Sequence, residues 1–323
     1  MFHITNGDHA NEWLEQAGVE GEFLSWDDVL HEGPVPTGLT LAELSQIRAR
    51  FISFSGWATE FEALTHFQTR DARLIAAARQ GEVVVWNSHE LFDQLHLLQI
   101  LSWYQQEGAG LPAPKLVFVD ELLGAGVLGT ERLQQLLEQA QPATAEQIAC
   151  ADDLWQLFTS SNPRGLAGAT KQPITQFPFM QQGLQRMVEE YPDSQGLSRT
   201  ERSILQGVIA GHDTPAELFR YVRDLEAIPF MGDASFWQII NGMFNSAQPL
   251  LRRIDGQSFE LPDLYNLSES FRAQQLALTA DAEILLSGQG NWLDQHQIDR
   301  WVGGVHLNPE NRWLWDGADF TRY

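Results

Sequence analysis

The chain has 323 residues, a hydrophobic fraction of 43%, 11 tryptophans, 18 phenylalanines and a formal net charge of −23 at neutral pH. This length and apolar content predict a globular protein of two domains, while the negative charge opposes binding to a phosphate backbone. No apolar run approaches the ~20 residues of a membrane span, and the N-terminus lacks a basic segment followed by an apolar one, so we expect a cytoplasmic protein without a membrane partner.

The first 120 residues alternate between strand-like and helix-like patterns. Strands are predicted over 1–6, 21–26, 82–87 and 115–121, and helices over 9–18, 40–54, a segment ending at Gly81, and 88–106 with Ser88 as N-cap. The run EVVVWN (82–87) is continuously apolar, which is typical of a strand buried on both faces. Strands separated by helices predict an α/β domain over 1–140, with a mostly parallel open sheet flanked by helices.

The rest of the chain is largely helical. Residues 141–195 are broken by prolines and predict a helical bridge with a linker at about 160–180. Over 196–323, helices are predicted at 196–211, 214–226 and 233–254, the first with the capping-box pair Ser198 and Glu201. The Trp-rich tail contains Gly-Gly and Asn-Pro and predicts a small β-hairpin. Three helices and a hairpin indicate a smaller, winged-helix-like α+β domain.

The predicted sheet suggests where a ligand would bind. Ligands of open parallel sheets lie outside the carboxyl ends of the strands, where helix N-termini point at them. Carboxylates or imidazoles follow all four predicted strands in this chain. We expect catalytic roles for Asp28, His31, Glu32 and His89, with His31 or His89 as general base, and ligand binding by Asn6, Gly7, Asp8, Trp26, Asn87 and Asp93.

Each of these residues also has a structural interpretation. Asp8 in an NGD turn can cap the next helix, and His31 and Glu32 before Gly33-Pro34 can shape a loop. Asp27 and Asp28 can be split, with one capping and one exposed. His89 at a helix N-terminus would stay neutral, as a base requires, whereas His96 lies among leucines and can simply pack.

Two further features carry less weight. The glycine-rich segment GAGVLG (124–129) lacks the Lys-Ser/Thr of a phosphate loop and is interpreted as a flexible loop. Cys150, the only cysteine, shares the apolar side of a predicted helix and is interpreted as a packing residue.

Cofactor and partners remain open at this level. Histidines and carboxylates are compatible with a divalent metal, but no HExxH, Walker A, GxSxG or GxGxxG motif is present. Residues 195–323 hold 10 arginines and no lysine against 17 acidic residues, a formal net charge of −7. A nucleic-acid reader should instead carry a basic stripe, so we expect this acidic domain to dock a protein partner or a second copy of the chain.

Several segments resemble a bacterial family known through domains of unknown function. They are HITNGD (3–8), SWDDVLHEGPVP (25–36), VVVWNSHELFDQLHLLQIL (83–101), GLSRTERSILQ (196–206) and RWVGGVHL (300–307). The resemblance extends over most of the chain but implies no reaction, cofactor or catalytic residue.

The leading hypothesis is therefore an α/β domain that binds a small polar ligand, with a hydrolase or group-transfer reaction. The alternative is a non-catalytic regulatory or scaffold protein. A transcription factor is disfavoured by charge.

Overall fold

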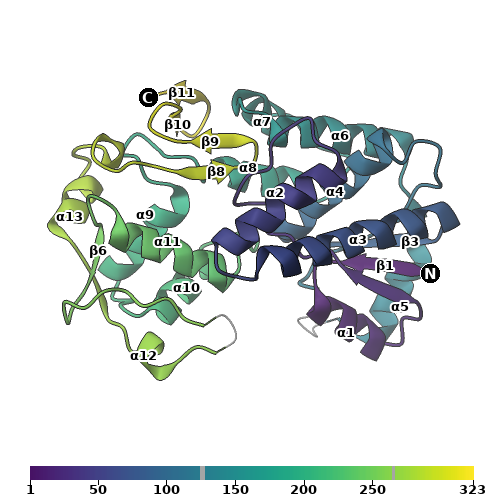
Figure 1. The fold of residues 1–323 in the computed structure, drawn as a ribbon, viewed down its shortest axis with the longest axis horizontal. Helices are drawn as coiled ribbons and strands as arrows, with labels where there is room; N and C mark the ends of the chain where they lie inside the picture. Colours follow the sequence, from purple (N-terminus) through teal and green to yellow (C-terminus); the bar gives the residue numbers. More distant parts are fainter. Residues whose placement is uncertain (124–127, 264–265) are drawn as a thin grey trace. The chain divides into compact units, whose positions relative to one another are not determined.

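The computed structural model describes residues 1–123, 128–263 and 266–323 (Figure 1). These residues form two compact units, one of Met1–Gln185 with Trp301–Val305, the other of Arg186–Arg300 with His306–Tyr323. The predicted domain boundaries at 140 and 195 stay predictions. Most of the predicted glycine-rich loop, 124–127, lies outside the described residues.

The first unit is built on a five-stranded sheet with the strand order β2-β1-β3-β4-β5. The strands are β1 (Phe2–Thr5), β2 (Glu22–Ser25), β3 (Val83–Ser88), β4 (Lys115–Val119) and β5 (Gln141–Pro142). The first four run parallel, with Ile4 opposite both Leu24 and Val85, and only β5 is antiparallel. The predicted α/β fold with a mostly parallel sheet is thereby confirmed.

Helices cover both faces of this sheet (Figure 1). On one face, α1 (Asp8–Gln16) and α5 (Thr130–Gln139) bury Leu14 and Leu133 against Val84, Trp86 and Val117. On the other lie α2 (Leu41–Phe54), α3 (Glu60–Gln80) and α4 (Leu91–Gln106), and α4 packs in turn on α6 (Ala145–Thr159). Burial on both faces explains why all six residues of β3 are buried.

Side-chain caps and one glycine set several helix ends. Thr40 with Glu43, and Thr59 with Glu62, form capping boxes that start α2 and α3. Helix α3 ends at Gly81, as predicted, with a left-handed φ of 81°. The predicted N-cap of α4, Ser88, is wrong. Ser88 is the last residue of β3, and Glu90 occupies the cap position.

The second unit contains α9 (Arg199–Ile209), α10 (Pro215–Asp224) and α11 (Asp233–Asn245) around one core. The predicted capping box of Ser198 and Glu201 is confirmed. The helix predicted to reach residue 254 ends at Asn245, and Leu251–Arg253 instead form strand β6, antiparallel to β7 (Leu276–Leu278). Pro249 separates the two elements and cannot continue a helix.

The remaining elements are short. Helix α7 (Arg164–Thr170) lies within the segment predicted as a linker, and α8 (Met180–Val188) follows it. The others are α12 (Glu269–Arg272), α13 (Ala280–Leu286), a 3-10 turn over Trp292–Asp294, β8 (Arg300–Val302), β9 (Val305–Leu307), β10 (Trp313–Trp315) and β11 (Phe320–Arg322). The predicted small hairpin corresponds to β8 and β9, which form a two-stranded sheet, and the winged-helix-like interpretation stays a prediction. No helix in the described ranges is long and apolar enough to cross a bilayer.

Candidate functional site

The strand order reverses between β1 and β3. Strand β1 has β2 on one side and β3 on the other, and α1 and α4, which follow β1 and β3, lie on opposite faces of the sheet. The loops after β1 and β3 therefore diverge at this point, which is where open α/β sheets place their ligands. The residues after β1, β2 and β3 define the candidate edge.

A pair of carboxyl groups lies between the ends of β1 and β3. The Asn6 amide nitrogen donates to Glu90 Oε2 at 2.9 Å and is 3.4 Å from Asp93 Oδ2. The Ser88 backbone N–H also donates to Asp93 Oδ2, at 2.8 Å, and the Ser88 hydroxyl lies 3.3 Å from Glu90 Oε2. One amide just after β1 thus contacts two carboxyl groups, one at the N-cap of α4 and one in its first turn.

The pKa of each of these two carboxyl groups is raised. Burial, followed by the neighbouring Glu90, raises the pKa of Asp93 to about 8, against the opposing effect of the hydrogen bonds from Ser88. Burial also raises the pKa of Glu90, against hydrogen bonds from Ser88 and Asn6. Asp93 therefore keeps its proton at neutral pH beside a second acid whose pKa is also raised, an arrangement suited to proton transfer.

A second polar group lies between the ends of β1 and β2. The Ser25 hydroxyl donates to Asp8 and accepts a 2.8 Å hydrogen bond from the Asn11 amide. Thr5 donates in turn to Asn11 Oδ1 at 2.6 Å. Two positions beyond Ser25, Asp27 lies 2.7 Å from His66 Nε2 of α3.

The predicted catalytic loop is organised around an arginine that the sequence analysis did not single out. Arg48 of α2 is fully buried and donates to both carboxylate oxygens of Asp28, at 2.8–3.1 Å. Its guanidinium also donates to the carbonyls of Glu32, at 2.7 Å, and Val29, at 3.1 Å. Asp28 is itself 0% exposed, so its carboxylate neutralises Arg48 and does not face solvent.

Trp26 and His96 also lie in the interior. The Trp26 indole is 1% exposed, donates to Gln99 Oε1 at 2.8 Å and stacks under the Arg70 guanidinium. His96 lies with Nε2 2.6 Å from the Asp28 carbonyl, and burial lowers its pKa to about 4. Its neutral ring therefore helps to fix the backbone after β2.

The other predicted residues are divided among separate groups. Asn87 donates to the Asp93 carbonyl at 2.7 Å and supports the start of α4 from within the core. His31 is buried, 3.9 Å from Glu32 Oε1 and edge-on to Phe92.

His89 precedes the cap of α4 and stands edge-on to Phe179. Burial lowers the pKa of His89, which favours the neutral ring that the sequence predicts. The prediction rested on the helix N-terminus, whereas burial is the main cause in the structure. The structure thus brings Asn6 and Asp93 together but places Asp8, His31 and His89 in three different groups of contacts.

These groups do not fit a metal ion. Over the described residues, no three His, Cys, Asp or Glu side chains lie close enough together to hold one. In the carboxyl pair at β1 and β3, Glu90 Oε2 and Asp93 Oδ2 instead accept hydrogen bonds from the Asn6 amide and from Ser88.

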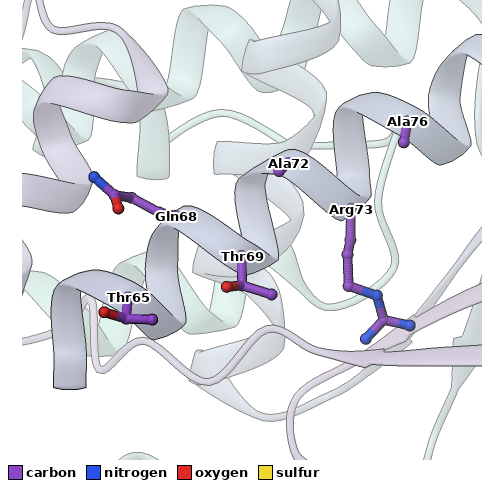
Figure 2. Close-up of a pocket in the computed structure, with 6 residues that line it drawn as sticks. All are labelled: Thr65, Gln68, Thr69, Ala72, Arg73 and Ala76. Atoms are coloured by element: carbon purple, nitrogen blue, oxygen red, sulfur yellow. The ribbon is translucent and has the colours of Figure 1, made fainter.

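A solvent-open groove of about 420 Å³ runs along α3 (Figure 2). It is lined by Thr65, Gln68, Thr69, Ala72, Arg73 and Ala76. Arg73 donates to the Phe23 carbonyl at 3.0 Å, so the groove lies beside the edge strand β2. All six lining residues belong to α3, and none is a predicted site residue.

Sequence reasoning missed Glu90, His66 and Arg48 as organising residues. Glu90 carried a usable signal, because it lies three residues after the predicted strand 82–87 and precedes Asp93 by three positions. His66 and Arg48 reach the edge from helices, 39 and 20 residues along the chain from their aspartate partners. No local pattern marks such pairs.

Comparison with known proteins leaves the family open: no protein-family model matches the chain, and the search of curated proteins finds no match. The resemblance to the bacterial family therefore stays a prediction, and only the site geometry supports a functional conclusion.

Proposed function

We propose that the first unit is an enzyme domain that binds a small polar ligand where β1 and β3 end and acts on it by general acid–base chemistry. The observation that carries the proposal is the carboxyl pair Glu90 and Asp93, held by the Asn6 amide where the strand order reverses. A hydrolase or group-transfer reaction fits such a pair, because both reactions need a proton delivered or removed in the transition state.

The charge of the edge argues against a phosphate ligand. Doubly wound sheets often bind phosphate at helix N-termini. Here Asp8 occupies the first turn of α1, Glu90 caps α4 and Asp93 lies in its first turn. Acidic side chains therefore already occupy both helix ends where a phosphate would bind, so the ligand should be neutral or cationic, for example a polyol or an amine.

The roles of the two carboxyl groups follow from their burial and pKa values. Asp93 is 2% exposed and, with a pKa of about 8, carries a proton at neutral pH. Glu90 is half-buried and is the member of the pair nearer to solvent. We therefore assign ligand contact to Glu90 and proton storage to Asp93.

A thermal-shift screen tests the proposal. Purified protein would be heated with neutral polyols, amines and phosphate esters, in parallel with the Asp93→Asn variant. A ligand at 100 times its Kd should stabilise the folded protein by about 2.7 kcal/mol. We expect polyols or amines to shift the wild-type Tm and to lose that effect in the variant. Shifts caused only by phosphate esters, unchanged in Asp93→Asn, would contradict the proposal.

The regulatory alternative predicts a different outcome. The second unit has exposed isoleucines at Ile209, Ile254 and Ile284, and 50–65% of the surface of each is accessible to solvent. If the chain were a non-catalytic scaffold, ligand binding would be insensitive to Asp93→Asn, and substitution of these isoleucines would instead abolish association with a partner.

A further inference from the structure

His66 lies at the same edge of the sheet and is not part of the Asn6, Glu90 and Asp93 group. It is on α3, and its Nε2 is 2.7 Å from Asp27 Oδ1. The side chains of the pair are 50% and 41% exposed, unlike the neighbouring Asp28 and Arg48, which are buried. The pair is therefore reachable from solvent.

The contacts around the pair link it to the end of β1. Asp27 lies two residues beyond β2, and β2 pairs directly with β1. Asp8, the third residue after β1, acts electrostatically on His66 and accepts the Ser25 hydroxyl. Since Asn6 joins the carboxyl pair, the short segment from Asn6 to Asp8 lies between both groups.

We infer that His66, oriented by Asp27, is a catalytic base that activates water or a hydroxyl for attack on an acyl substrate, an ester above all. The inference rests on the proposed function, because it names the class of substrate for the site at the same edge of the sheet. With Nε2–H donated to the Asp27 carboxylate, the lone pair of the neutral ring is on Nδ1. The aspartate fixes both the tautomer and the direction of the ring.

The reaction needs only the ester, one water molecule and His66. Nδ1 takes a proton from the attacking water as its oxygen bonds to the acyl carbon. The bond from that carbon to the leaving oxygen then breaks, and the proton passes from Nδ1 to the leaving oxygen. The products are a carboxylic acid and an alcohol, and His66 returns to its neutral form.

The charged groups that face His66 adjust its basicity. The hydrogen bond that His66 donates to Asp27 raises the pKa of His66, and burial lowers it. The charges of Asp27 and Asp8 raise this pKa and that of Arg70 lowers it, with a net increase. A base with a raised pKa accepts a proton more readily once it is neutral. The contribution of His66 should therefore grow as the pH rises through its pKa.

Hydrolysis of p-nitrophenyl acetate by the full chain tests the inference. The variants are His66→Gln and Asp27→Asn, with His9→Gln as control because His9 is an exposed histidine of α1. General base catalysis typically contributes about 10²–10⁴-fold. For this small probe we expect His66→Gln to lower the rate by at least about tenfold, and His9→Gln to leave it unchanged.

A second readout separates a catalytic from a structural role. Asp27→Asn removes the charge that raises the pKa of His66, so the midpoint of the rate against pH should move to lower pH. Both substitutions alter an exposed pair and should change stability by less than about 1 kcal/mol, which a thermal melt checks. A wild-type rate no higher than that of equimolar imidazole, or an unchanged rate in His66→Gln, would overturn the inference.

The two proposals can fail separately. If the ligand screen depends on Asp93 while ester hydrolysis is indifferent to His66, only the acyl base is wrong. If hydrolysis depends on His66 while the screen shows no dependence on Asp93, the assignment of the ligand site to β1 and β3 is wrong.

Discussion

Replacing Arg48 by methionine should destabilise the first unit more than any surface change. Arg48 is fully buried and holds both carboxylate oxygens of Asp28 together with the carbonyls of Val29 and Glu32. Methionine keeps much of the apolar stem but leaves Asp28 as a buried, unpaired carboxylate. Breaking a buried pair in this way costs about 3–5 kcal/mol. For a unit of 150–250 residues this corresponds to a fall in Tm of roughly 6–20 °C.

Urea unfolding followed by circular dichroism measures this loss. Arg50→Met is the matched control, because Arg50 lies on the same helix in an exposed pair with Glu60 at 3.4 Å. It should change the free energy of unfolding by less than about 1 kcal/mol. Adding Asp28→Asn to Arg48→Met removes the stranded charge and should recover part of the stability. A loss below about 1 kcal/mol in Arg48→Met would refute the view that this ion pair organises the loop.

Three further changes test other parts of the structure. The pKa of Asp93 is about 8 in the folded chain and near 3.8 in the unfolded chain. The free energy of unfolding should therefore fall as the pH rises between these two values. In urea titrations, Asp93→Asn should make this fall with pH smaller. Arg186→Met leaves the buried carboxylate of Glu190 without its ion-pair partner, while Glu226 keeps Arg199, and should cost about 3–5 kcal/mol; a loss as small as that of exposed Arg223→Met would contradict this. In Gly304→Ala the new Cβ would lie 1.6 Å from the Thr159 carbonyl oxygen, and we expect a loss of about 1–3 kcal/mol, which an unchanged Tm would disprove.

Local patterns predicted most of the sheet. The apolar run of β3 and the glycine that ends α3 act over a few residues, and both predictions are confirmed. The prediction failed where the deciding partner was distant or where two signals competed. Ser88 has the chemistry of an N-cap, but the ladder with β4 keeps it in the strand and leaves the cap to Glu90. The helix predicted to reach 254 was extended past Pro249, although proline cannot continue a helix, and α11 already ends at Asn245.

The candidate site was less predictable, because its parts come from different elements. The rule that ligands lie at strand carboxyl ends places Asn6 and Asp93 at one edge, and they meet there. The same rule cannot say which side chains turn inward. His31 and Trp26 lie at that edge in sequence but are buried in the structure. Their direction depends on helices packed against the loop, which no spacing in the loop encodes.

Trp26–Pro36 shows how one turn can hold structural and chemical residues side by side. Asp28 is buried and binds Arg48, whereas its neighbour Asp27 is exposed and binds His66. The position of Asp27 depends on the backbone that the Asp28 ion pair and the His96 hydrogen bond hold in place. A preorganised site needs such support, because a loosely held carboxylate cannot keep an imidazole in one orientation. The buried residues of this loop therefore act on the proposed chemistry through Asp27, and their own side chains need not touch the substrate.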